Sequence, residues 1–276
     1  MIRPVSLRLI RTDFFMEQLS KILKQPIITS PGLVLELISY IDLTTLSESD
    51  TDQSVLALVE KANQGFEGIH PAAICSYSRF ANLVRTNLNH GMQTVVVGFG
   101  FPSGLSTIEE KLKDAETIAT SEAEELDIVL NHTDFIEHNY SKINAEISQI
   151  KSVLGTKHLK VILETGKLKT QEHIKKASEI ACEAGTDFIK TSTGKTDTGA
   201  TAESVYQMCA VIADYFQKTG RRVGIKPSGG IRTFEDAARL HLIVKNTLGN
   251  DWLKPTLFRI GASSLYDNLI KKYKEI

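Results

Sequence analysis

The sequence lacks an excess of charge of either sign, a cysteine framework and a long apolar run, and each absence excludes a class of protein. Its 32 basic residues face 33 acidic ones, for a formal net charge of −1, which does not favour nucleic acid or an anionic membrane as a partner. Cys75, Cys182 and Cys209 form no C-x-x-C pair, so a secreted disulfide framework is not indicated. No run is long and apolar enough to span a bilayer. We therefore expect a cytoplasmic protein with no nucleic-acid or membrane partner.

Two common cofactor signals are also missing. The seven histidines are scattered without an H-x-x-x-H pair, and no dense acidic cluster stands out, so we predict no metal site. No G-x-G-x-x-G follows an early strand, which argues against a dinucleotide-binding fold. We expect chemistry that needs no cofactor.

What the sequence does contain is a regular alternation of short apolar runs and helical patterns. The helical patterns carry apolar residues at spacings of three and four and end at glycines such as Gly155, Gly185 and Gly220. We expect a single helix from Ile136 to Leu154, and Ser106 with Glu109 has the spacing of a capping box. The expected strands are 40–43, 72–75, 93–97, 126–130, 159–163, 187–190, 223–226 and 257–260.

Eight strands alternating with helices predict an α/β protein with a closed, parallel (β/α)8 barrel, the TIM barrel. An open doubly wound sheet is the competing architecture. No linker or repeat divides the chain, so we predict one barrel domain over residues 33–276 and an N-terminal extension over residues 1–32 with a short helix near 13–24. The basic residues of the extension faintly resemble a transit peptide, but Asp13 and Glu17 interrupt that pattern, and Met16 is an alternative start.

The most informative residues are two lysines, Lys190 and Lys226, each at the end of an apolar run and before a glycine-bearing turn. A lysine normally stays at the surface because its ammonium loses hydration when buried. Two lysines aimed at one site would make one amine easier to deprotonate, and a neutral amine forms a Schiff base with a carbonyl substrate. The alternative is two surface lysines with solvated ends, but the pair favours chemistry.

Acidic residues accompany the lysines at the carboxyl ends of the expected strands, where a parallel barrel places its active site. They are Asp42, Asp127 and Glu164. Asp127 lies inside an apolar run, where a carboxylate needs a cation or hydrogen-bond donors nearby. A structural ion pair explains this spacing as well as catalysis does.

Three glycine- and serine-rich turns suggest an anion site. Residues 228–230 follow the seventh expected strand, residues 261–264 follow the eighth, and Gly194-Lys195 follow the sixth. Glycines let backbone N–H groups approach a ligand, and loops after strands seven and eight are a recurrent phosphate site in this fold. Tight turns and a serine helix cap are the alternative explanation.

These features together resemble the deoxyribose-phosphate aldolase family, class I aldolases with a (β/α)8 barrel. The stretch FIKTSTGK, at residues 188–195, is the most specific, and the other stretches support it by their order along the chain. The matching stretches are residues 42–46, 72–75, 125–127, 160–166, 187–195, 226–233 and 261–265.

The resemblance implies roles for individual residues. Lys190 would form the Schiff base, and Asp127 would transfer protons. Lys226 would be the second active-site lysine, which perturbs Lys190. The phosphate would be bound by Gly194, Lys195, Gly229, Gly230, Ser263 and Ser264. Three further residues, Asp42, Thr44 and Cys75, would lie around the pocket.

The resemblance also implies reversible cleavage of 2-deoxy-D-ribose 5-phosphate, a small phosphorylated sugar, without a cofactor. Two positions depart from the family pattern. Ser228 stands where alanine is expected, and the chain does not end in the tyrosine that assists proton transfer in some members, which leaves that role absent or to Tyr273. Another class I aldolase and an inactive sugar-phosphate-binding barrel are alternatives. The oligomeric state is open, with a homodimer as one possibility.

Overall fold

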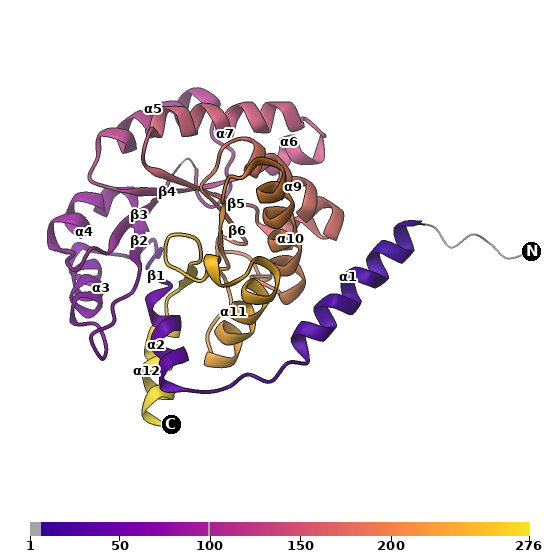
Figure 1. The fold of residues 1–276 in the computed structure, drawn as a ribbon. Coiled ribbons are helices and arrows are strands. Elements are labelled where there is room, and N and C mark those ends of the chain that lie inside the picture. Colours follow the sequence, from indigo (N-terminus) through magenta and orange to yellow (C-terminus); the bar gives the residue numbers. More distant parts are fainter. Residues whose placement is uncertain (1–6, 99) are drawn as a thin grey trace, which may run out of the picture.

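Eight parallel strands form a barrel surrounded by helices in the computed structural model, which describes residues 7–98 and 100–276 (Figure 1). The sheet order is β7-β6-β5-β4-β3-β2-β1-β8, and every strand pair in it is parallel. The strands are β1 (Ile41–Thr44), β2 (Ala73–Tyr77), β3 (Gln93–Val97), β4 (Glu125–Val129), β5 (His158–Ile162), β6 (Phe188–Lys190), β7 (Gly224–Lys226) and β8 (Ile260–Ala262).

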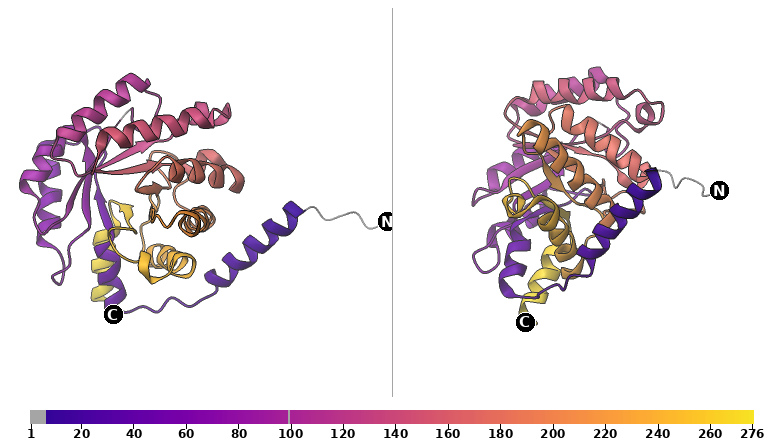
Figure 2. Two further views of the ribbon diagram at one scale, coloured as in Figure 1. Left: turned by 45° about the horizontal axis from the view of Figure 1, so that its top comes forward. Right: turned by 45° about the vertical axis from the view of Figure 1, so that its right-hand side comes forward.

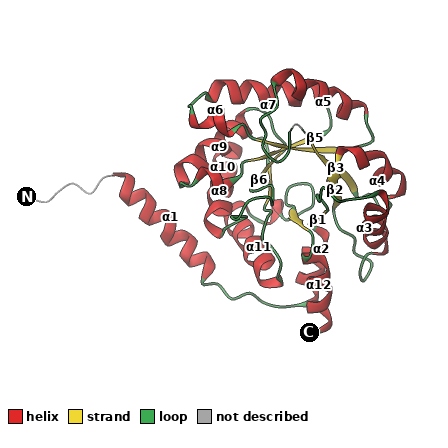
Figure 3. Cartoon of the chain, turned by 180° about the vertical axis from the view of Figure 1, so that it is seen from behind, coloured by secondary structure: helices red, strands yellow, loops and turns green. Residues whose placement is uncertain are grey.

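The barrel closes between residues 225–228, at and just after the end of β7, and residues 258–261, which lead into and include the start of β8. Two parallel bridges, Ile225 with Phe258 and Ser228 with Gly261, join these segments. Figure 3 shows the strands at the centre with helices on all sides. The predicted (β/α)8 barrel is therefore confirmed, and the open sheet is wrong.

The helices follow the strands in the expected alternation. Their apolar faces cover the outer surface of the barrel and form the main hydrophobic core. Their bounds are α2 (Pro31–Ser39), α3 (Asp52–Gln64), α4 (Ala81–Asn87), α5 (Ile108–Thr120), α6 (His132–Ile136), α7 (Tyr140–Leu154), α8 (Thr165–Leu168), α9 (Gln171–Glu183), α10 (Ala202–Thr219), α11 (Phe234–Leu248) and α12 (Leu265–Lys274).

Three predicted elements need correction. The eighth strand begins at Ile260 rather than at residue 257, because Phe258 forms only an isolated bridge, to Ile225 of β7, and the ladder with β1 starts at Ile260. The expected helix from Ile136 to Leu154 is two helices, α6 and α7: His138 has a φ of 59°, which interrupts the helix, and Ile136 is 75% exposed. The capping box before α5 is formed by Thr107 and Glu110, one residue later than predicted.

The N-terminal helix α1 (Leu7–Leu23) runs along the outside of the barrel next to α10 and α11 (Figure 2). Leu19 and Ile22 are buried, and Arg239 of α11 donates hydrogen bonds to the carbonyls of Leu23 and Gln25. The predicted helix in the extension is thus confirmed, with an earlier start. The first six residues of the extension lie outside the described residues, and the division at residue 32 stays a prediction. No helix in the described part of the chain is long and apolar enough to cross a bilayer.

Candidate active site

A cavity of about 440 Å³ opens at the carboxyl ends of the strands. It lies among the loops that follow β1, β6, β7 and β8, and Lys190 reaches it from the end of β6. This is the end of a parallel barrel where active sites are built. The lining residues are 44–47, Lys190, 193–195, 228–232 and 261–264.

All the residues predicted to bind phosphate line this cavity. Gly229 and Gly230 have φ values of 83° and 78°, which a residue with a side chain rarely adopts. Ser264 occupies the N-cap position of α12, but its side chain makes no capping hydrogen bond. Side-chain capping of the helix therefore does not explain this serine. Serine-and-glycine turns at a helix start are a type of backbone that can offer N–H groups to an anion.

Lys195 and Arg232 place positive charge at the same cavity. The Lys195 ammonium donates a hydrogen bond to the carbonyl oxygen of Leu46 at 2.5 Å, so it bridges the loops after β6 and β1. Arg232 was not among the predicted site residues. Its signal in the sequence is its place two residues after Gly230, in the turn already assigned to an anion.

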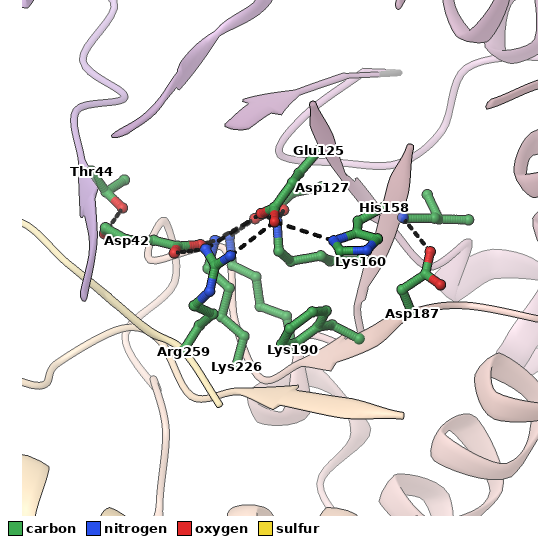
Figure 4. A network of polar contacts seen from close by, with 12 residues as sticks. Asp42, Thr44, Glu125, Asp127, His158, Lys160, Asp187, Lys190, Lys226 and Arg259 are labelled. Carbon is green, nitrogen blue, oxygen red and sulfur yellow. Dashed lines mark hydrogen bonds and ion pairs between the residues drawn. The ribbon is translucent and has the colours of Figure 1, made fainter. Parts of the chain in front are cut away.

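The two predicted lysines meet at one carboxylate oxygen, Oδ2 of Asp127 (Figure 4). Lys190 and Lys226 are register partners on β6 and β7, so their side chains point to the same face of the sheet. Each ammonium donates to Oδ2 of Asp127 at 2.8 Å. Of the three residues, only Lys190 lines the cavity; Lys226 and Asp127 do not.

The charges of Asp127 and Lys226 are set by this contact. Burial opposes ionisation of Asp127, but the ammonium groups of Lys160, Lys190 and Lys226 outweigh it and hold the pKa of Asp127 well below its ordinary value. Burial likewise opposes the charged form of Lys226, yet Asp127 and Asp42 raise its pKa. Both groups are therefore charged at neutral pH.

The other acidic residues and the cysteine occupy different places. Asp42 is buried against Lys226, with Oδ2 at 2.5 Å from the Lys226 ammonium. Cys75 is fully buried, which raises the pKa of its thiol. Neither Cys75 nor Asp42 lines the cavity, whereas Thr44 does.

Glu164 accepts hydrogen bonds from the amide of Thr193 at 3.3 Å and from its hydroxyl at 2.5 Å, so it holds the loop that carries Gly194.

Three charged residues of the barrel interior were not predicted: Glu125, Lys160 and Arg259. All three are at most 3% exposed, and Lys160 donates to Oδ1 of Asp127 at 3.1 Å. The signal that identified Asp127, a charged residue within an apolar strand, applies to them as well. Among residues 7–98 and 100–276, no group of three or more His, Cys, Asp or Glu side chains is placed to hold a metal ion.

Comparison with known proteins identifies one family. The model of a family described as DeoC/LacD family aldolase matches residues 36–265. The chain is 39% identical over 251 residues to a deoxyribose-phosphate aldolase of Homo sapiens, with 86% of this chain and 79% of the human protein covered. It is 39% identical over 247 residues to the enzyme of that name from Bos taurus, with 84% and 78% covered.

A solved structure resembles the fold over nearly the whole chain. The tetrameric deoxyribose phosphate aldolase from Aeropyrum pernix has a TM-score of 0.69 and 26% identity, with 94% of this chain and 97% of that chain covered.

Proposed function

This chain belongs to the DeoC/LacD family of aldolases, and from this premise we propose that it cleaves 2-deoxy-D-ribose 5-phosphate reversibly to D-glyceraldehyde 3-phosphate and acetaldehyde. The relatives that bear the name deoxyribose-phosphate aldolase support this substrate. The observation that carries the proposal is the place of Lys190: a buried amine at the floor of a cavity whose rim is built to bind an anion.

Lys190 is the nucleophile of this proposal because its ammonium takes part in fewer ion pairs with carboxylates than that of Lys226. Its ammonium contacts one carboxylate, Asp127, whereas the Lys226 ammonium contacts two, Asp127 and Asp42. Lys226 also keeps its proton, since its pKa is raised. The neutral amine of Lys190 then has the free electron pair that attack on a carbonyl requires.

The reaction follows from that amine. Lys190 adds to the aldehyde carbon C1 of the open-chain sugar, and loss of water gives an iminium ion. As the proton of the 3-hydroxyl is removed, the C2–C3 bond breaks and its electron pair passes to the iminium nitrogen, which forms an enamine and releases glyceraldehyde 3-phosphate. Protonation at C2 and hydrolysis release acetaldehyde and restore Lys190.

Asp127 serves these steps as the proton-transfer group. Its Oδ2 lies 2.8 Å from both ammonium groups, so it can pass a proton between Lys190, Lys226 and a water molecule. The phosphate is held by backbone donors of Gly229, Gly230 and the start of α12, with Lys195 and Ser263 beside them. Binding at this rim fixes the reacting end of the sugar over Lys190.

The first experiment is incubation of the full chain with acetaldehyde and borohydride, followed by peptide mapping with mass spectrometry. One reduced ethyl adduct on Lys190 is the expected result. An adduct on Lys226 instead would reverse the two lysine roles. The absence of any site-selective adduct in folded protein would favour an inactive sugar-phosphate-binding barrel.

A second experiment tests the phosphate site. Ser263→Glu places a carboxylate at the rim, so kcat/KM for deoxyribose 5-phosphate should fall about 100-fold, the order expected for a like charge in a binding site. Unphosphorylated deoxyribose should lose much less, and Ser263→Ala, the matched control, should affect both sugars mildly. Equal losses for both sugars with Ser263→Glu would place the phosphate elsewhere.

Assembly and location remain part of the proposal. We expect self-association, as a homodimer or a larger assembly, because the Aeropyrum pernix relative is tetrameric. Light scattering coupled to gel filtration measures this directly. A cytoplasmic location is consistent with the proposed substrate and is tested by fractionation.

A further inference from the structure

Six buried side chains form a closed ring of ion pairs inside the barrel, in which carboxylates and cations alternate (Figure 4). The ring is linked to the cavity through Asp127, because Lys190, which lines the cavity, contacts this carboxylate. The Lys226 ammonium bridges Asp42 Oδ2 at 2.5 Å and Asp127 Oδ2 at 2.8 Å, and Lys160 contacts Asp127 Oδ1 at 3.1 Å. In order, the ring members are Glu125, Arg259, Asp42, Lys226, Asp127 and Lys160.

Glu125 and Arg259 complete the ring. Arg259 donates through Nη1 to Asp42 Oδ1 at 2.6 Å and through Nη2 to Glu125 Oε1 at 2.9 Å. The second oxygen of Glu125 accepts a hydrogen bond from the Lys160 ammonium. Each ring member therefore has a partner of opposite charge on both sides.

The ring is balanced, and Lys190 is the additional charge. Three carboxylates face three cations within the ring, while the Lys190 ammonium attaches from outside at Asp127 Oδ2. The ring members are at most 3% exposed, so their charges act over the barrel interior with little screening by water. Two other titratable groups face the ring: Cys75 from β2, and His158 from β5, whose Nδ1 lies 3.3 Å from Glu125 Oε1.

We propose that Glu125 and Arg259 are positioning residues of the aldolase site, which act through the ring to leave Lys190 as the cation without a counter-charge of its own. This rests on the proposed Schiff-base function of Lys190. Glu125 holds Lys160 against one oxygen of Asp127, and Arg259 holds Asp42 against Lys226. Neither residue lines the cavity that contains Lys190.

The charge balance predicts opposite effects for two substitutions. Glu125→Gln leaves four cations, including Lys190, facing two carboxylates, so the Lys190 ammonium should lose its proton at lower pH. Arg259→Met leaves three cations, including Lys190, facing three carboxylates. The Lys190 ammonium is then needed for balance and should lose its proton at higher pH.

The test measures the rate of acetaldehyde trapping on Lys190 by borohydride as a function of pH, in the full-length protein. The acid limb, the pH below which trapping falls to half, should move down by about one pH unit in Glu125→Gln and up by about one unit in Arg259→Met, the order expected for one buried charge. The double variant Glu125→Gln/Arg259→Met restores the balance and should return the limb toward that of the native protein.

Two controls distinguish a positioning role of Glu125 and Arg259 from a general loss of protein stability. Glu146→Gln breaks the buried ion pair with Lys111, which lies between α5 and α7, and should leave the limb in place. If Arg259→Met does not fold, Arg259→Lys replaces it: the charge is kept, so the limb should stay within about 0.3 pH units of native while trapping slows, because one ammonium replaces the fork between two carboxylates.

The outcomes are distinct. Opposite shifts that cancel in the double variant support the proposal, and so does a downward shift in Glu125→Gln with an unmoved limb in Arg259→Lys. Shifts in the same direction, or unmoved limbs in the folded single variants Glu125→Gln and Arg259→Met, overturn it. Native protein that traps no acetaldehyde on Lys190 would instead overturn the proposed function, so the two failures can be told apart.

Discussion

In the described part of the chain, lysines are buried against carboxylates in two regions, inside the barrel and between α5 and α7. In the second region Lys111 contacts Glu146 at 2.7 Å, and the two side chains are 2% and 8% exposed. That pair is one cation with one carboxylate. Inside the barrel, Lys190 shares Asp127 with Lys226 and Lys160, and it alone of these three lysines lines the cavity at the carboxyl ends of the strands. The comparison teaches that a buried lysine becomes a candidate nucleophile under two conditions. The cations around it must outnumber the carboxylates, and its amine must reach the cavity where a substrate binds.

The largest effect is expected when the lysine that lines the cavity, Lys190, is replaced. Lys190→Ala removes the amine that forms the covalent intermediate, so cleavage of deoxyribose 5-phosphate should fall by at least about 10⁴-fold and borohydride trapping should vanish. Lys111→Met, which removes a lysine of similar burial, should keep its activity per folded molecule. Turnover that survives Lys190→Ala would exclude this lysine as the nucleophile.

A smaller effect is expected at Lys226. Lys226→Leu removes a positive charge beside Lys190, so Asp127 holds the Lys190 proton more firmly and imine formation should require a pH higher by about one unit. At pH 7 we expect a rate about 100-fold lower, because a proton-transfer partner is also lost. The pH–rate profile is the measurement, and an unchanged acid limb would contradict electrostatic tuning by Lys226.

The helix–helix pair should affect stability alone. Glu146→Gln leaves Lys111 buried without a counter-charge, which should lower the free energy of unfolding by about 3 kcal/mol. Urea unfolding measures this loss. The kcat of the folded fraction should stay within about twofold of native, and a larger fall would mean that the two regions are coupled.

The mildest effect concerns pH and the stability of the ring. Burial opposes ionisation of Asp42, Glu125 and Asp127, but the neighbouring cations lower the pKa of all three. Groups whose pKa is lowered by folding contribute stability that is fully present above their unfolded pKa of about 4 and is lost as pH falls through the folded values.

We therefore expect these carboxylates to leave stability unchanged between about pH 8 and 5 and to lower it below about pH 4. Urea unfolding at a series of pH values checks this. Glu125→Gln, which has one carboxylate fewer, should show a shallower acid decline than native, and a steeper one would contradict the assignment.

Much of the fold was predictable because it depends on patterns among residues that are close together in the sequence. Alternating apolar runs and amphipathic helices predicted the barrel, and strand ends were placed within about one or two residues except at β8, whose edge depends on how the barrel closes. The single helix expected over 136–154 failed because apolar spacing continues across a turn at His138 that the spacing does not reveal.

The site was predictable in part for the same reason. Lys190 and Lys226 stand out because each ends an apolar strand, and glycine turns reveal the anion rim. Glu125, Lys160 and Arg259 are also charged residues in apolar runs. Their neighbours in the sequence do not indicate that the three side chains contact one another. Their contacts depend on the register between paired strands, both those that follow one another, such as β4 and β5, and those at opposite ends of the chain, β1 and β8.

The sequence by itself determined the kind of protein, because strand and helix periods, glycine turns and lysines within apolar runs are properties of neighbouring residues. Only the tertiary structure decided which charges face one another. Closing the barrel brings Asp42, Asp127, Lys190 and Lys226, from four different strands, within hydrogen-bond distance. The balance of charge is a sum over such contacts. Lys190 is therefore the additional cation only in the folded barrel.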